Sequence, residues 1–313
     1  LHSTLAANLS NLRSASGTVT AAFGSNGTFT GNLGTARVTV ATGVSFTSTA
    51  ALVSGKHVTA AGSGNIVITA LHSTLAADLS NLSKSSGSIT AAFDGTGTFT
   101  GNLGTAGVVV TVADSFTMTA AANIVAGSNK TINKASNGVL AVEVGSADAN
   151  VDLTTITGTA FSSVTVTQDV TFIGTLDDTV GTSINNGITL TTAAAKVTGK
   201  TVSGNGSIVI EGVGASTDLS NVNPAGGVTG TLANGINISS NSNLGNVDSF
   251  TLDNNASVTV SIAQNAKIST ATGTNTVTLS EAGTATGAAG VETYNLASGA
   301  NNFTSANGGQ TVI

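Results

Sequence analysis

An acidic stretch in the middle of the chain has the spacing of a calcium-binding loop. Asp148, Asn150 and Asp152 stand at every second position and alternate with small apolar residues. Carboxylate and amide oxygens are the ligands that Ca²⁺ prefers. The stretch departs from the EF-hand pattern, because Leu153 stands at the glycine position and Thr159 at the position of the terminal glutamate. We expect solvated acids at a turn, and retain Asp148, Asn150 and Asp152 as candidate ligands of an ordered calcium ion.

Other residues that could do chemistry are few and scattered. The chain has no cysteine, which excludes disulfides and thiol chemistry. Of the three histidines His2, His57 and His72, the first and last occupy the same position of a repeat, which suits a structural role. Asp177 and Asp178 are adjacent acids, and neighbours on a strand point to opposite faces. No phosphate-binding glycine loop is present, so we expect no enzyme, no catalytic residue and no cofactor-binding residue.

The composition points to a folded chain of unusual type. Charged residues make up 8% of it, against about 25% in typical globular domains. Hydrophobic residues reach 40%, and the chain contains a single proline, so its composition argues against disorder. The net charge is −6 and no cluster of Lys or Arg exists, which argues against a nucleic-acid partner. No apolar run approaches the roughly 18 residues of a membrane-spanning helix.

The sequence repeats itself. Its opening words, "LHSTLAANLSNL", return as "LHSTLAADLSNL" at 71–82, where Asp78 replaces Asn8. Fainter versions surround Asp152 and Asp218, so units of about 70 residues tile most of the chain. The approximate repeats are 1–70, 71–140, 141–211 and 212–280, with a partial fifth at 281–313. Because Asn and Asp both hydrogen-bond their own backbone in turns, we interpret the exchange as tolerance at one turn position.

The repeated words allow two local structures. Leu71, Leu75, Leu79 and Leu82 fall at helical spacing, which taken alone predicts an amphipathic helix. The fourth copy, "EGVGASTDLSNV", has glycines where a helix needs good helix formers. We therefore predict a turn followed by a short strand, with a single helical turn in the first two copies as the alternative.

The rest of each repeat predicts strands. Short alternating runs such as "GTFTGN", "RVTVA" and "NIVITA" recur roughly every ten residues, separated by Gly or Asn-Gly. Their small and β-branched side chains suit a thin core between closely stacked strands. We predict an all-β, elongated β-solenoid resembling a parallel β-helix, as a single rod over residues 1–313. It would have about 13–15 coils of roughly 20–25 residues, with two or three strands per coil.

Three phrases carry a resemblance. "TGKTVSGNGSIVIEG" at 198–212, "STDLSNVNPAGGVTGT" at 216–231 and "YNLASGANNFTSANGGQTVI" at 294–313 resemble repeats of very large secreted bacterial surface proteins. These include S-layer proteins and giant adhesins of Gram-negative bacteria. The resemblance implies an extracellular or cell-surface location, export by a dedicated secretion system and a structural role. The chain lacks the GGxGxD nonapeptide with which many such proteins bind calcium.

From these features we expect a structural extracellular protein that self-assembles into a surface layer, sheath or filament by stacking and head-to-tail contacts. The alternative is the stalk or repeat region of a large bacterial adhesin that mediates surface attachment or biofilm formation. The expected partner is the chain itself, with cell-surface polysaccharide as a further candidate. Calcium is the one cofactor that the sequence brings into consideration.

Overall fold

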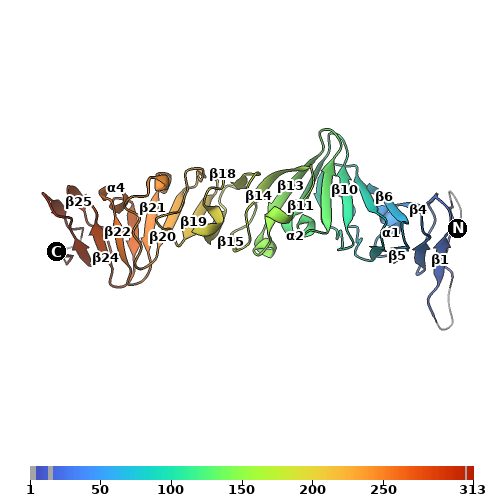
Figure 1. The fold of residues 1–313 in the computed structure, drawn as a ribbon, viewed down its shortest axis with the longest axis horizontal. Helices are drawn as coiled ribbons and strands as arrows, with labels where there is room; N and C mark the ends of the chain where they lie inside the picture. Colours follow the sequence, from blue (N-terminus) through green and yellow to red (C-terminus); the bar gives the residue numbers. More distant parts are fainter. Residues whose placement is uncertain (1–4, 13–16, 307–308) are drawn as a thin grey trace. The chain divides into compact units, whose positions relative to one another are not determined.

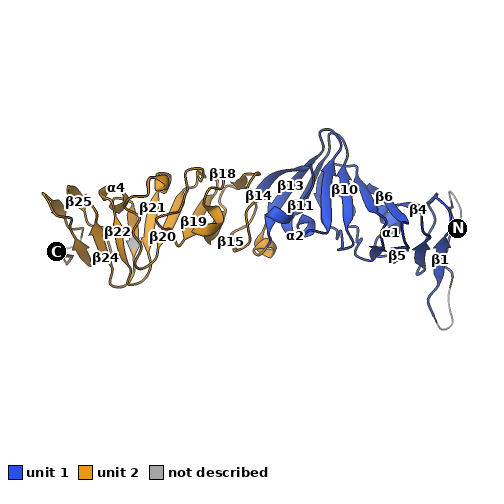
Figure 2. Cartoon of the chain, in the orientation of Figure 1, with its two compact units in different colours: residues 1–144, 151–164 blue, residues 145–150, 165–313 orange. Residues whose placement is uncertain are grey.

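The strands of this chain are parallel and stack coil upon coil. The computed structural model describes residues 5–12, 17–306 and 309–313, so His2 lies outside the described residues. The fold is an all-β solenoid of about 14 turns with 8% helix, as the sequence predicted. Within each unit the strands follow one another in chain order (Figure 1). The chain divides into two compact units, residues 1–144 with 151–164, and residues 145–150 with 165–313 (Figure 2).

The first unit builds its coils from short strands in separate parallel sheets. One sheet has the order β1-β3-β5-β7, another β12-β10-β8-β6-β4-β2, and β9, β11 and β13 pair in a third. Successive strands along the chain therefore alternate between sheets, as a coiled path requires. The elements are β1 (Thr20–Phe23), β2 (Gly27–Phe29), β3 (Arg37–Val40), β4 (Ser45–Thr49), α1 (Ala50–Val53), β5 (Val58–Ala60), β6 (Asn65–Leu71), β7 (Leu82–Lys84), β8 (Ile89–Phe93), β9 (Gly97–Phe99), β10 (Val108–Val112), β11 (Thr117–Ala121), α2 (Ala122–Val125), β12 (Lys130–Lys134), β13 (Val139–Val144), the 3₁₀ turn η2 (Leu153–Thr155) and the start of β14 (Phe161–Val166).

The second unit repeats the arrangement. Its largest sheet has the order β15-β17-β19-β20-β21-β23, and smaller ones have the orders β22-β24-β26-β28 and β25-β27. β16 pairs with β18. The elements are η1 (Ser146–Asp148), the end of β14, β15 (Val170–Phe172), β16 (Thr182–Ile184), β17 (Thr189–Ala193), α3 (Ala194–Val197), β18 (Val202–Gly204), β19 (Ser207–Glu211), β20 (Val228–Leu232), η3 (Ser242–Leu244), β21 (Ser249–Leu252), β22 (Ser257–Val260), α4 (Ile262–Asn265), β23 (Ile268–Ala271), β24 (Thr276–Leu279), β25 (Thr284–Thr286), β26 (Thr293–Asn295), β27 (Asn302–Thr304) and β28 (Thr311–Val312).

Strand register gives the length of each coil. Thr20 pairs with Arg37 across one coil of the first unit, whereas Val58 pairs with Leu82 across a longer one. Coil length therefore varies along this unit. The coil from Thr20 to Arg37 is shorter than the roughly 20–25 residues that the sequence predicted, and the coil from Val58 to Leu82 lies within that range. Extra residues are accommodated mainly at the corners between strands, although the pairing of β6 with β8 also shifts register between Ile68 and Leu71.

The core is thin and filled by alternate side chains. In β10, Val108, Val110 and Val112 are buried while the residues between them are half-buried. Aromatic rings pack against one another in the core of the first repeat, where Phe23 and Phe46 lie edge to face with their ring centroids 4.8 Å apart. Burial of these alternating apolar side chains is the main favourable term in the stability of the stack.

Each repeat also contains one helical turn that the sequence did not predict. The short helices α1, α2, α3 and α4 begin at Ala50, Ala122, Ala194 and Ile262, and so recur with about the period of the sequence repeat. Each directly follows a strand or is one residue beyond it. In α1, α2 and α3 the first residue is alanine and the last is valine, and both are buried. The positions of the short helices therefore follow the same repeat as the sequence.

Within the described residues, no helix has the length and apolar character needed to cross a membrane.

Candidate functional site

Two of the three candidate calcium ligands, Asp148 and Asp152, accept hydrogen bonds from neighbouring protein groups. Asp148 is buried, at 3% exposure, and its Oδ2 accepts a hydrogen bond of 2.9 Å from the backbone N–H of Gly145. Asp152 is exposed, and its Oδ1 accepts from the backbone N–H and the hydroxyl of Thr154. Asn150 is exposed. Among the described residues no group of three or more His, Cys, Asp or Glu side chains is arranged to hold a metal ion. The calcium site remains a prediction.

Asp152 belongs to a recurring corner of the solenoid, which we call the Asx corner. At each such corner the Asn or Asp is followed by leucine or isoleucine, and its side-chain Oδ1 accepts a hydrogen bond of 2.9–3.1 Å from the backbone N–H two residues on. The residue between them is leucine, or isoleucine at one corner, and it is buried at every corner except the first, where Leu9 is half-buried. The Asx corners are at Asn8, Asn32, Asp78, Asn102, Asp152, Asp218 and Asn237.

The Asx corner explains why Asn8 and Asp78 exchange. Both side chains present an oxygen to the backbone N–H of the following serine, at 3.0 Å in each case. A carboxylate and a carboxamide are equivalent in this role. In the second copy Asp78 forms an isolated bridge with Asn102, and β7 begins at Leu82. The described part of both copies contains a turn and isolated bridges and no helix, and in the second copy only the end residues Leu71 and Leu82 belong to strands. The predicted turn is present, whereas the predicted short strand is not formed around Leu9 or Leu79.

Hydrogen bonds at these corners affect ionisation. The hydroxyl and backbone N–H of Ser80 hold the pKa of Asp78 below its ordinary value, because both donate to the ionised carboxylate. The backbone N–H and hydroxyl of Ser220 lower the pKa of Asp218 in the same way. Both carboxylates are therefore charged at neutral pH and serve as acceptors rather than as acids in catalysis.

A second set of side-chain oxygens joins one coil to the next, and we call these contacts clips. In a clip, the Oδ1 of Asn or Asp accepts the backbone N–H of a residue about one coil further on, at 2.7–3.0 Å. Each clip satisfies a backbone donor at a corner where the β-ladder is interrupted. The acceptors of these clips are Asn26, Asn65, Asp114, Asp169, Asn234 and Asn255.

The adjacent acids Asp177 and Asp178 lie in a loop rather than on a strand. Burial alone would raise the pKa of Asp177, but hydrogen bonds from Thr179 and Val180 and the charge of Lys200 together lower it. Asp178 forms an ion pair with Lys200. Both acids are thus engaged in holding the loop.

His72 forms a pair with Asp94, with 2.8 Å between Nδ1 and Oδ1, and both side chains are about two-fifths exposed. The equivalent of Asp94 in the first repeat is Gly24. The neighbouring Ser73 donates its hydroxyl to the carbonyl of Thr96, so the three residues do not form a nucleophilic triad.

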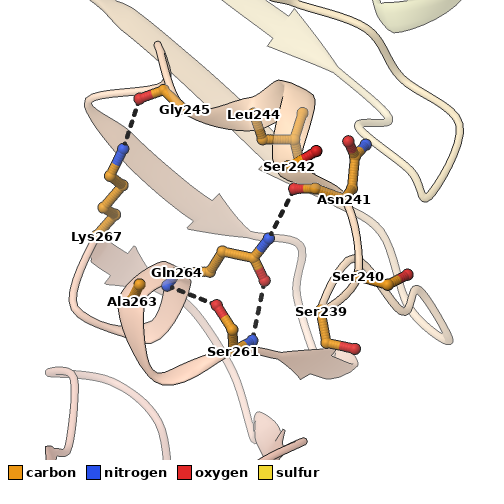
Figure 3. A pocket seen from close by; sticks show the side chains of 10 residues that line it. All are labelled: Ser239, Ser240, Asn241, Ser242, Leu244, Gly245, Ser261, Ala263, Gln264 and Lys267. Carbon is orange, nitrogen blue, oxygen red and sulfur yellow. Dashed lines mark hydrogen bonds between the residues drawn. The ribbon is translucent and has the colours of Figure 1, made fainter.

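The second unit contains a polar pocket of about 290 Å³ beside α4 (Figure 3). Its lining residues are Ser239, Ser240, Asn241, Ser242, Leu244, Gly245, Ser261, Ala263, Gln264 and Lys267. The lining includes four serines, two amide side chains and one ammonium group. The lining residues include no histidine, cysteine, aspartate or glutamate.

Most polar groups of this pocket already bind protein atoms. Gln264 donates through Nε2 to the carbonyl of Ile238 at 2.8 Å, and its Oε1 accepts from the N–H of Ser261 at 2.9 Å. The ammonium group of Lys267 donates to the carbonyls of Gly245 and Val247 at 2.9 and 2.6 Å. The pocket is therefore a place where two successive coils are tied together, as Figure 3 shows for Gln264 and Lys267. Sequence reasoning missed it, because its two sides come from different coils and lie far apart in the sequence.

One uncharged surface extends across the largest sheet of the first unit. A row of in-register residues crosses its six strands on the outer face, and each member is exposed or half-buried. The row consists of Thr28, Thr47, Val67, Thr90, Val109 and Thr131. The row presents methyl and hydroxyl groups and no charge, which makes this face suitable for contact with another surface.

Comparison of the chain with models of protein families, with curated proteins and with solved structures finds no match.

Proposed function

We propose that this chain is a structural protein, a building block of an extracellular surface layer, sheath or filament. The observation that supports this function is how its polar side chains are used. Asx corners, clips and the ties of the polar pocket all bond to backbone atoms within a coil or of the neighbouring coil. A fold whose polar groups serve stacking in this way provides length and stiffness rather than a reaction centre.

Assembly would proceed through strand edges. In the second unit, β28 pairs with β26 through the N–H groups of Thr311 and Ile313, which donate to Glu292 and Tyr294. The N–H of Val312 therefore points away from β26, and the side chains of Val312 and Ile313 are 45% and 73% exposed. An edge of this kind accepts a further strand. We propose that a further coil pairs here, either from a second copy or from a longer chain of the same type.

The edge can be blocked selectively. Val312→Pro removes the outward N–H and leaves both inward hydrogen bonds of β28 in place. We expect recombinant chains to form concentration-dependent assemblies in sedimentation velocity, with Val312→Pro shifting them toward monomers and the control Val312→Thr assembling as the parent chain does. Equal assembly by parent and proline variant would rule out head-to-tail pairing at this edge.

Lateral contacts would complete a layer. The uncharged row from Thr28 to Thr131 offers a face for a second rod, or for cell-surface polysaccharide. Six strands at about 4.8 Å spacing make a face of only a few hundred Å², which is less than the roughly 800 Å² per partner of a stable interface. Such a contact would be weak singly and effective only when repeated along an assembly.

A further inference from the structure

Asn-Gly dipeptides are the sites where a polypeptide most easily modifies itself, and this chain has six of them. The glycine lacks a side chain that would shield its nitrogen, so that this nitrogen can reach the neighbouring carboxamide. Asn307-Gly308 lies outside the described residues. The other pairs are Asn26-Gly27, Asn137-Gly138, Asn186-Gly187, Asn205-Gly206 and Asn234-Gly235.

Two of these pairs form a natural comparison. Asn186-Gly187 and Asn234-Gly235 both lie in turns, and the two glycines have φ values of +75° and +80°. In the second pair, both Asn234 and Gly235 form a hydrogen bond to the next coil. Asn234 Oδ1 accepts from the N–H of Ser257 at 2.8 Å, and the N–H of Gly235 donates to the carbonyl of Ser257 at 2.8 Å.

Asn186-Gly187 has neither of these bonds. Both residues are exposed, and in the described part of the chain the Asn186 side chain and the Gly187 N–H have no hydrogen-bond partner. A bond from Ile188 N–H to the carbonyl of Asn185, at 3.1 Å, closes the turn around them. The carboxamide is thus free to rotate toward the adjacent nitrogen.

The remaining pairs are protected in other ways. Gly138 and Gly206 are buried, and their N–H groups donate to Ala135 and Ile184 at 2.9 Å each. The Oδ1 of Asn26 is engaged in a clip with the N–H of Ser45 at 2.8 Å. We infer that Asn186-Gly187 is the site among the described Asn-Gly pairs at which the folded chain deamidates and isomerises spontaneously.

The reaction needs only water. The backbone nitrogen of Gly187, on losing its proton to base, attacks Cγ of Asn186, the new C–N bond closes a succinimide ring, and the side-chain nitrogen leaves as ammonia. Water then adds to one of the two ring carbonyls and opens the ring to aspartate or isoaspartate. Either product carries one more negative charge, and isoaspartate adds a methylene to the backbone just before β17.

Peptide mapping by mass spectrometry tests the inference. The folded chain is incubated at mildly alkaline pH, and conversion at each Asn-Gly pair is followed with time. We expect Asn186 to convert at least about fivefold faster than any of the other four, the factor that loss of one net hydrogen bond supplies. Asn186→Gln should remove this fast conversion, because a glutamine would have to close a larger ring.

The same experiment in concentrated denaturant is the control for sequence effects. There the five pairs should convert at similar rates, since clips and burial are lost. Equal rates at Asn186 and Asn234 in the folded chain, verified as folded by circular dichroism, would overturn the inference. So would a fast site at Asn186 that is equally dominant in denaturant, because the selectivity would then come from local sequence and not from the fold.

Discussion

The helices α3 and α4 occupy the same place in successive repeats of the second unit, yet they bury different side chains. The fourth residue of α3 is Val197, which has 0% exposure, and the fourth residue of α4 is Asn265, with 2% exposure. Asn265 donates through Nδ2 to the carbonyl of Thr286 at 2.8 Å, and its Oδ1 accepts from the hydroxyl of Tyr294 at 3.1 Å. That hydroxyl in turn accepts from the N–H of Ala288 at 2.8 Å.

This difference shows what the core of the solenoid tolerates. A buried amide costs free energy unless its donors and acceptors are satisfied. Thr286 and Tyr294, which follow Asn265 along the chain, supply those partners. A polar residue can therefore replace valine at this position only together with matching residues in the neighbouring coil.

The largest expected loss of stability comes from placing an amide at a buried position that offers it no hydrogen-bond partner. Val197→Asn should lower the free energy of unfolding by about 3 kcal/mol, because an unsatisfied amide replaces an apolar side chain. Urea denaturation followed by circular dichroism measures the change. Val197→Ala is the control for lost packing alone, and an asparagine variant as stable as the alanine variant would contradict the expectation.

The converse change tests whether Asn265 and Tyr294 act as a pair. Asn265→Val leaves the hydroxyl of Tyr294 and the carbonyl of Thr286 without their partner, and should cost about 2 kcal/mol. Tyr294→Phe alone should cost about 1 kcal/mol. The double variant Asn265→Val with Tyr294→Phe should cost less than the sum of the two single changes. Strict additivity in this cycle would mean that the two side chains do not depend on each other.

The ionisation of Tyr294 provides a spectroscopic view of the same cluster. Burial raises the pKa of Tyr294 above its ordinary value, although the hydrogen bond from Ala288 partly opposes this. The chain contains one tyrosine and no tryptophan, so tyrosinate absorbance reports this residue alone. Because the folded state holds the phenol proton more tightly, stability is complete below about pH 10 and falls as the pH rises through the folded pKa.

In absorbance titrations we expect the native transition to occur above that of the unfolded chain. Tyr294→Phe should abolish the associated loss of stability in alkaline solution. A titration of native Tyr294 that coincides with the unfolded chain would show that the ring is not sequestered by this cluster.

The smallest expected effect concerns the Asx corners. Because the pKa of Asp78 is lowered on folding, its contribution to stability is present above the unfolded pKa and is lost as the pH falls through the folded pKa. Asp78→Asn should remove this acid-sensitive part while preserving the turn, since Asn8 makes the same hydrogen bond in the first repeat. Denaturation curves at acidic and neutral pH measure the difference. Asp78→Ala, which removes the hydrogen-bond acceptor, should lower the free energy of unfolding at both acidic and neutral pH.

Features that depend on local sequence could be predicted, and those that depend on the next coil could not. The β-solenoid and the turn at Asp78 follow from alternation, Asn-Gly signals and the ability of Asx side chains to bond their own backbone. The four-residue helices are too short to show a helical period, and "AALV" reads equally well as part of a strand. The burial of Asn265 and the clips depend on partners about one coil away, whose register the sequence does not reveal. The candidate calcium ligands Asp148, Asn150 and Asp152 are predicted from spacing alone, which does not determine where side chains point.

Fibre diffraction from aligned assemblies of the recombinant chain tests the proposed role most directly. If coils of successive copies stack head to tail, a reflection at about 4.8 Å, the strand spacing, should lie along the long axis of the assembly. Monomers that persist at high concentration, or assemblies in which this reflection lies across the long axis, would contradict the account.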